Sequence, residues 1–393
     1  MKIALGIITK NITEDISVLS FIENARNHGR EIDKLIIAYS HEMDYVYLKE
    51  LEAHIDVDII KINESYSIES DLRNMGIEEV VYKTFTKSLD FELFNKVPYS
   101  FSRNLVLIKA MLLNMDYLFF VDTDVYPSIV NEDNKLEEID FINSHLEYLK
   151  DPDVAITTSD YSGYFIIPPM QEFYGLKEYM YGLQKESAYN RVVCTDCISY
   201  GRKENRQIKD TNKILGGNVA IKLDAYYKKN LPPFFSSTYS VNGERVLTRG
   251  EDTLLGLFAK RNNARIVDID LLIFHDTYKH FPTIPDIKTQ QNVKDRLYYA
   301  SLGWIGRNPF LNFVKEDNYL AKYKEQREYL KKYSKYVAQH LDDDRFLVME
   351  DAIDLAFDKL PKFVKEYENT REKFSLIVQK IAGGVLVNEN STC

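Results

Sequence analysis

The stretch MDYLFFVDTDVYP, from Met115 to Pro127, decides the fold class because an apolar run ends abruptly on two aspartates. The segment YLFFV has the length and aromatic content of a buried β-strand. In a parallel α/β sheet, ligands bind beyond the carboxyl ends of the strands, which is where Asp122 and Asp124 would lie. Two carboxylates this close repel each other unless a cation lies between them, so the pattern predicts a divalent metal with phosphate oxygens on its far side. The simpler alternative, in which Asp122 caps a turn and Asp124 is solvated, stays open for so short a motif.

Upstream of this stretch, short apolar runs alternate with amphipathic segments. Strands are predicted over 2–9, 33–40 and 57–63, and helices over 15–29 and 43–54. This alternation predicts a parallel sheet covered by helices on both faces. Residues 64–97 are more polar and are interpreted as an irregular insertion.

The pattern resumes with a helix over 100–114 that leads into YLFFV. A helix over 135–150, a strand over 153–159 and a Gly-rich turn into a strand and helix over 215–230 follow. From about residue 286 the chain is charged and shows helical periodicity to its end, with strongly amphipathic segments that need a covering partner.

Composition excludes several classes of protein. The chain has 393 residues, of which 45% are hydrophobic and 28% charged, as in an ordinary globular protein. A net charge of -10 with no basic face excludes broad nucleic-acid binding. Three cysteines do not make a disulfide framework, and the Cys194–Cys197 pair has no second pair or nearby His to make a zinc site. Because no apolar run is long enough to span a bilayer, we expect a cytoplasmic protein.

Four motifs, taken together and in this order, resemble the core of the GT-A glycosyltransferases. They are SRNLVLIKAMLLNMDYLFFVDTDVYP (102–127), LGGNVAIKLDAYY (215–227), RGEDTLLG (249–256) and IFHD (273–276). In that superfamily the first motif ends in the metal-binding DxD, the second is a Gly-rich strand and helix, the third carries a Glu-Asp pair and the fourth a late His ligand. The resemblance spans about residues 2 to 280 and is greatest to inverting members.

The resemblance implies a fold and a division of the chain. The expected fold class is α/β, with a Rossmann-like mixed sheet flanked by helices and a mostly helical C-terminal module. The GT-A catalytic domain would cover 1–285, with a nucleotide-sugar-binding half at 1–150 and an acceptor half at 151–285. The helical module would cover 286–393.

The same resemblance assigns a metal site. Asp122 would face the nucleotide or its ribose, and Asp124 would bind Mn²⁺ or Mg²⁺ together with the diphosphate. His275 would add a nitrogen ligand, which suits manganese better than magnesium. The divalent ion would stabilise the charge of the departing nucleoside diphosphate. For His275 the alternative of a structural histidine at a strand end stays open.

Other residues complete the expected donor site. Arg103 would contact the diphosphate from a helix N-terminus and Asn104 would order the loop, although capping and a surface ion pair are the alternative. Gly216 and Gly217 would let the backbone approach the donor sugar. The remaining donor-binding positions are Thr9, Thr123 and Asn218, the last as a hydrogen-bond partner of sugar hydroxyls. A plain turn before a strand also explains the segment LGGN.

Glu251 and Asp252 are the expected catalytic residues. In the functional interpretation Asp252 removes the proton of the acceptor hydroxyl while Glu251 positions the acceptor. The dipole of a helix N-terminus also favours two acids there. That alternative explains the acids but not Gly250, which precedes them.

The sequence therefore predicts a metal-dependent, inverting glycosyltransferase of the hexosyltransferase type. Its partners would be a nucleotide-sugar donor, with a UDP-sugar favoured, and a glycan, lipid-linked or protein acceptor. The C-terminal helices would pack on the catalytic domain or form a homodimer. Two alternatives stay open: a haloacid-dehalogenase-like phosphatase that uses Asp122 and Asp124, and a non-catalytic sugar- or partner-binding protein.

Overall fold

The computed structural model describes the chain except residues 15, 89–96, 132, 134, 164–166, 168, 194–207, 280–282, 284, 317 and 391–393, and it leaves the side chains of 270 and 384–390 undescribed. The Cys194–Cys197 pair lies outside the described residues. Of the helices within the described part, none combines the length and apolarity that crossing a membrane requires.

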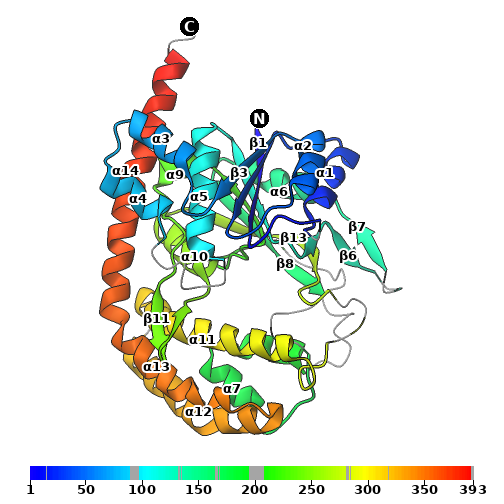
Figure 1. Ribbon diagram of the computed structural model, residues 1–393, viewed down its shortest axis with the longest axis vertical. Helices are drawn as coiled ribbons and strands as arrows, with labels where there is room; N and C mark the ends of the chain where they lie inside the picture. Colours follow the sequence, from blue (N-terminus) through cyan, green and yellow to red (C-terminus); the bar gives the residue numbers. More distant parts are fainter. Residues whose placement is uncertain are drawn as a thin grey trace.

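The core of the molecule is a nine-stranded sheet with the order β3-β2-β1-β4-β10-β8-β13-β5, in which β9 pairs with β13 (Figure 1). The neighbours from β3 to β4 are parallel, and β10 is antiparallel to both β4 and β8. The strands are β1 (Ile3–Thr9), β2 (Lys34–Tyr39), β3 (Val57–Lys61), β4 (Tyr117–Val121), β5 (Val125–Tyr126), β8 (Val154–Gly163), β9 (Lys209–Asp210), β10 (Asn218–Lys222) and β13 (Arg265–His275).

The mixed sheet confirms the fold class and corrects the purely parallel arrangement that the alternation of strands and helices predicts. β10 enters the sheet from the Gly-rich turn at the edge where β4 ends, so that Asn218 pairs with Val121. A strand that starts where its neighbour ends must run antiparallel to it. The first half of the chain follows the predicted alternation, with strands and helices close to the expected ranges.

Helices cover both faces of this sheet. One face packs against α1 (Val18–Asn27), α2 (Tyr45–His54) and α6 (Phe141–Leu149). The other face packs against α5 (Tyr99–Leu112), α9 (Asp224–Lys229), α10 (Glu251–Arg261) and part of α14 (Leu360–Asn390). A small hairpin of β6 (Ser128–Val130) and β7 (Leu136–Glu138) lies at the rim.

The interpretation of 64–97 as an irregular insertion is wrong for its described part. This segment forms α3 (Tyr66–Asn74) and α4 (Glu79–Thr86), which bury Ile68, Leu72, Tyr82 and Phe85 in the same core as the sheet. The two helices have only 9 and 8 residues, so each offers about two turns of periodicity from which to recognise it in the sequence.

The C-terminal part is helical, as predicted. It consists of α11 (Gln291–Val314), α12 (Tyr319–Leu341), a 3-10 turn over Asp344–Val348, α13 (Met349–Asp358) and α14. With α7 (Leu176–Gly182), α8 (Tyr189–Val192), β11 (Thr238–Val241) and β12 (Glu244–Leu247), these helices enclose a second hydrophobic cluster.

Helix α14 belongs to both hydrophobic clusters. Phe363 and Tyr367 pack in the second hydrophobic cluster, and Phe374, Ile377 and Ile381 pack in the core against the sheet. In Figure 1 this helix runs along one side of the molecule from the lower helices to the sheet, and α11 crosses below the sheet edge. The C-terminal helices therefore pack on the part of the chain that contains the sheet, while the division at residue 285 and the homodimer stay predictions.

Candidate active site

The residues of the predicted motifs meet at one edge of the sheet, where β4 ends and β10 begins. Asp122 follows β4, and Gly217 precedes β10 directly beside it. A Cβ added to Gly217 would lie 2.2 Å from the Oδ2 atom of Asp122, and one added to Gly216 would lie 2.7 Å from the Nη2 atom of Arg103. Glycine is needed here because protein side chains press against the turn. That observation differs from the predicted role, in which the glycines admit the donor sugar.

Arg103, in the second turn of α5, contacts residues of the other predicted motifs. Its Nη2 atom lies 3.1 Å from Asp122 Oδ1, its Nε atom 3.3 Å from Glu251 Oε1, and its Nη1 atom donates to the carbonyl of Gly216 at 2.7 Å. The side chain is almost fully buried. Burial alone would lower the pKa of Arg103, but the charges of Asp122 and Glu251 outweigh it and raise that pKa. All three donor nitrogens face protein atoms, so the structure gives Arg103 an ordering role in addition to the predicted diphosphate contact.

Glu251 and Asp252 open α10 after Gly250, whose φ of +88° lies in the left-handed region that favours glycine. The Oδ2 atom of Asp252 accepts from the Gly216 amide at 2.9 Å, and its Oδ1 atom accepts from the Thr253 amide at 2.6 Å. Glu251 is buried, and its burial and the nearby Asp252 raise its pKa despite the pairing with Arg103. Asp252 is thus the more accessible acid of the pair.

Asp124 and His275 form a second pair at the same edge. The Nε2 atom of His275 lies 3.3 Å from Asp124 Oδ1 because β13 pairs with β5 at Val125. Burial opposes ionisation of Asp124, but the charge and hydrogen bond of His275 and the charge of Arg296 outweigh it and lower the pKa of Asp124 to about 2. Within the described part of the chain, no three His, Cys, Asp or Glu side chains are arranged to hold a metal. The structure brings together two of the three predicted metal ligands, Asp124 and His275, whereas Asp122 pairs with Arg103.

Three further predicted residues have well-defined partners. The side-chain amide of Asn104 pairs with both backbone groups of Phe234, at 2.9 Å each, and so holds that segment, while its place in the donor site stays a prediction. The Oγ1 atom of Thr9 donates to the carbonyl of Asn11 at 2.8 Å. The carbonyl of Thr123 accepts from the amide of Ser17 at 3.2 Å.

Asn218 is placed differently from its predicted role. Its side chain is fully buried, with His145 Nε2 3.2 Å from its Oδ1 atom and the carbonyl of Asp160 3.3 Å from its Nδ2 atom. Burial lowers the pKa of His145 to about 3, so this ring is neutral. The amide is engaged inside the protein, because alternate residues of β10 point to opposite sides of the sheet and Asn218 points inward.

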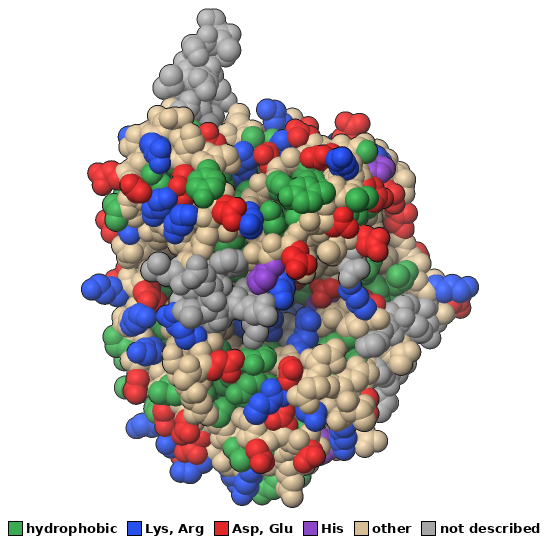
Figure 2. Space-filling model, viewed as in Figure 1, with side chains coloured by type: hydrophobic (Ala, Val, Ile, Leu, Met, Phe, Trp, Pro, Cys, Tyr) green, Lys and Arg blue, Asp and Glu red, His purple; other side chains and the backbone are tan. Residues whose placement is uncertain are grey.

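Several site residues escape analysis of the sequence. Tyr161 of β8 lies with its ring centroid 4.7 Å from that of His275, and its burial and the charges of Asp122 and Asp252 raise its pKa well above its ordinary value. Arg296 of α11 approaches Asp124 Oδ2 at 4.0 Å. Figure 2 shows charged side chains of both signs and His gathered midway between the upper and lower parts of this face.

Helix α11 also carries Arg307, whose Nη1 atom would lie 2.7 Å from a Cβ at Gly250. Arg296, Gly303 and Arg307 are spaced by seven and four residues, which places them on one helical face. In the sequence, this spacing alone indicates that the three residues lie on one face of a helix. It does not indicate that this face is directed toward the site.

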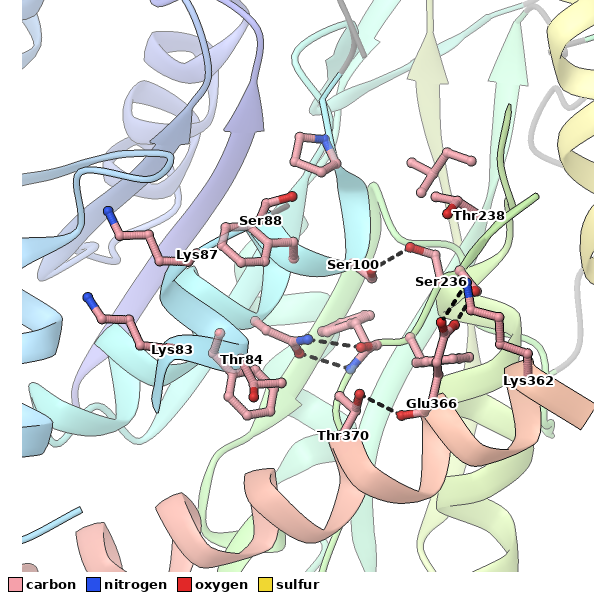
Figure 3. Close-up of a pocket in the computed structure, with 18 of the residues that line it drawn as sticks. Lys83, Thr84, Lys87, Ser88, Ser100, Ser236, Thr238, Lys362, Glu366 and Thr370 are labelled. Carbon is pink, nitrogen blue, oxygen red and sulfur yellow. Dashed lines mark hydrogen bonds and ion pairs between the residues drawn. The ribbon is translucent and has the colours of Figure 1, made fainter. Parts of the chain in front are cut away.

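A separate cavity of about 640 Å³ lies between α4, α5, residues 234–238 and α14 (Figure 3). Its basic side chains have protein partners: Lys83 pairs with Glu69 at 2.7 Å, and Lys362 pairs with Glu366 at 3.2 Å. The ammonium group of Lys83 points away from Glu366 in Figure 3. Two of the basic side chains that line this cavity are therefore paired with carboxylates.

No family model and no curated protein matches this sequence. Solved structures match it weakly. One is glucosyl-3-phosphoglycerate synthase from Mycobacterium tuberculosis with Mn²⁺, UDP and phosphoglyceric acid, at 13% identity, with 80% of this chain and 78% of that chain covered and a TM-score of 0.39. The same synthase with Mn²⁺ and UDP-glucose has 12% identity, 78% coverage of each chain and a TM-score of 0.38. A mycobacterial protein has 12% identity, 77% and 74% coverage and a TM-score of 0.37. We therefore base the functional conclusion on this chain's own residues.

Proposed function

We propose that this chain is a metal-dependent glycosyltransferase of the hexosyltransferase type, which moves a sugar from a nucleotide sugar, with UDP favoured, to an acceptor hydroxyl with inversion. One observation carries the proposal: Arg103 joins Asp122, at the end of β4, to Glu251, at the start of α10, within one buried network. The acids of two motifs that resemble glycosyltransferases thereby meet at the ligand-binding edge of the sheet.

The Asp124–His275 pair is the expected place for Mn²⁺ or Mg²⁺. A carboxylate oxygen and an imidazole nitrogen 3.3 Å apart are a donor set that fits a manganese ion, with diphosphate oxygens as further ligands. When bound, the ion supplies stabilisation of the charge that develops on the leaving diphosphate. Asp124 is ionised at neutral pH because His275 and Arg296 lower its pKa, so no proton has to be displaced from this ligand.

Asp252 is the expected base. As the acceptor oxygen forms its bond to the anomeric carbon, the bond from that carbon to the diphosphate oxygen breaks, and its electron pair leaves with the diphosphate. Asp252 takes the hydroxyl proton. The hydrogen bond from the Gly216 amide holds the Asp252 carboxylate in one orientation, and the buried Glu251 stays paired with Arg103.

The two alternatives explain less of the geometry. A phosphatase would use Asp122 as a nucleophile, but this carboxylate is paired with Arg103 and packed against Gly217. That reaction also gives no role to Glu251 and Asp252. A non-catalytic protein gives no role to Asp252, the more accessible acid of its pair, or to the Asp124–His275 pair.

Calorimetric titration tests the proposal. UDP should bind the wild type much more tightly with Mn²⁺ than without it, and Asp124→Ala should remove the metal dependence while the protein stays folded. Asp351→Ala, at an exposed acid of α13, is the matched control. Metal-independent UDP binding by the wild type, or release of phosphate from p-nitrophenyl phosphate with no turnover of any UDP-, GDP- or CMP-sugar, would refute the proposal.

A further inference from the structure

Three basic side chains from different parts of the chain meet around one turn of α11. Arg307 belongs to that turn. Arg249, just before α10, lies against Gly303, where an added Cβ would be 2.4 Å from its Cγ atom. The Nζ atom of Lys185, which follows α7, lies 4.5 Å from the ring centroid of Trp304. Arg307 also touches the backbone at the start of α10, so the cluster lies next to the proposed base.

These three charges lack carboxylate partners. Among the described residues, no Asp or Glu oxygen forms an ion pair with Lys185, Arg249 or Arg307, whereas Arg103 has two such partners. Arg307 is 4% exposed, and although its Nη2 atom donates to Asn308 Oδ1 at 2.9 Å, its buried Nε atom has no hydrogen-bond partner. A buried arginine without a carboxylate partner is unusual, because buried charges are normally paired.

The electrostatics agree with this geometry. Burial lowers the pKa of Arg307 to about 10 although Asp252 and Glu251 act against that change. Burial also lowers the pKa of Lys185 well below its usual value, and the positive charges of Arg307 and Arg249 add to this effect. Positive charge is therefore crowded together in a site where water cannot screen it fully.

We infer that the acceptor carries a phosphate group, which Lys185, Arg249 and Arg307 bind beside Asp252; the inference rests on the proposed function. Asp252 and Glu251 both act on Arg307, but Glu251 is already paired with Arg103. Lys213 adds further positive charge near Lys185. A phosphate monoester, which carries about -1.5 to -2 at neutral pH, supplies the negative charge that this cationic cluster lacks. Guanidinium groups bind phosphate oxygens through two parallel hydrogen bonds. A carboxylate offers one negative charge and two oxygens, whereas a phosphate offers three acceptor oxygens to the three cationic side chains.

The donor's diphosphate does not account for the cluster. The Asp124–His275 pair, which is the expected metal site, lies at the other end of α11, where Arg296 approaches Asp124 at 4.0 Å. Arg296 and Arg307 are eleven residues apart, or about 16 Å along a helix that rises 1.5 Å per residue. Helix α11 thus places Arg296 near Asp124, on the expected donor side, and Arg307 near the start of α10, on the expected acceptor side.

The test compares acceptors and measures phosphate binding. With the donor that the wild type uses, glycerol 3-phosphate should be glycosylated, while glycerol and glycerate should not. Inorganic phosphate should bind the wild type, and Arg307→Met should weaken that binding by about tenfold or more. Arg249→Gln, at a less buried position, should do the same if Arg307→Met does not fold. Lys335→Met is the control, because Lys335 lies over the ring of Tyr336 at 5.0 Å on α12, as Lys185 lies over Trp304.

The outcomes separate the inference from the proposed function. Equal use of glycerol or glycerate, or unchanged phosphate binding in both variants, would overturn the inference while metal-dependent UDP binding still supports a glycosyltransferase. A loss of UDP binding in Arg307→Met as large as the loss of phosphate binding would assign the cluster to the donor and also overturn it. Absence of metal-dependent UDP binding in the wild type would instead contradict the proposed function.

Discussion

The two buried arginines of the site should respond oppositely to the same substitution. Among the residues that the structure describes, Arg103 has two carboxylate partners and Arg307 has none; the pKa of Arg103 is raised and that of Arg307 is lowered. Both are nearly inaccessible to solvent, at 3% and 4% exposure. Arg103→Met and Arg307→Met therefore remove the same charge and a similar volume from opposite electrostatic surroundings.

For Arg307, the fall in pKa from 12.5 to about 10 corresponds to roughly 3 kcal/mol against the charged form. Because the folded pKa is below the unfolded one, the native state carries this cost at every pH below about 10 and loses it as the pH rises further. Methionine removes the cost but forfeits the hydrogen bond to Asn308, worth about 2 kcal/mol for a charged donor. Arg307→Met should thus raise the free energy of unfolding by about 1 kcal/mol.

Arg103→Met leaves Asp122 and Glu251 without their cation, which typically costs about 3 to 5 kcal/mol. The two variants should therefore differ by roughly 4 to 6 kcal/mol in free energy of unfolding, measured by denaturant titration at pH 7 in phosphate-free buffer. In thermal melts, about 2.1 cal/mol/K per residue implies a shift of about 1 °C per kcal/mol for a chain of 393 residues. Equal destabilisation in both variants would mean that Arg307 is a structural cation, and the argument from uncompensated charge would fail.

Three further changes test other parts of the site and fold. Asp252→Asn keeps an oxygen for the Gly216 amide but loses the proton acceptor, so turnover should fall by about 10²- to 10⁴-fold with near-normal UDP binding; wild-type turnover would rule out the base. Gly217→Ala places a Cβ 2.2 Å from an Asp122 oxygen and should weaken metal-dependent UDP binding in titration, whereas Gly383→Ala, with nothing within 4 Å, should not. Phe374→Ala removes a buried ring of α14 and should cost about 3 to 5 kcal/mol in denaturant titration; a loss below 1 kcal/mol would show that α14 is not part of the core.

Much of the fold is predictable from local patterns. Strands such as β1 and β4 are continuous apolar runs, and α5 has a clear apolar stripe, so their type and order follow from periodicity. α3 and α4 are missed because they are short, with 9 and 8 residues, and follow each other in a polar segment. The direction of β10 is also hidden in the sequence, because it depends on where its Gly-rich turn lies relative to the end of β4.

The candidate site is predictable to the level of its motifs, but its contacts are not. Asp124 and His275 are expected together and lie together. The pairing of Arg103 with Glu251 joins residues 148 positions apart and depends on side-chain conformations that no spacing encodes. Arg296 and Arg307 belong to a segment that resembles no motif, and they enter the site only because α11 packs across the cleft.

The position of α14 limits how the cleft can open. Tyr367 is anchored below the cleft and Ile381 beside the sheet, about 21 Å apart along a single helix. A rigid-body rotation of about 10° between the two parts would move one anchor by about 4 Å, which a close-packed interior does not absorb. Helix α14 therefore resists a hinge motion between the two parts of the molecule. Substrates should enter and products should leave through local rearrangement at the rim, and a covalent crosslink across the two parts should leave turnover intact.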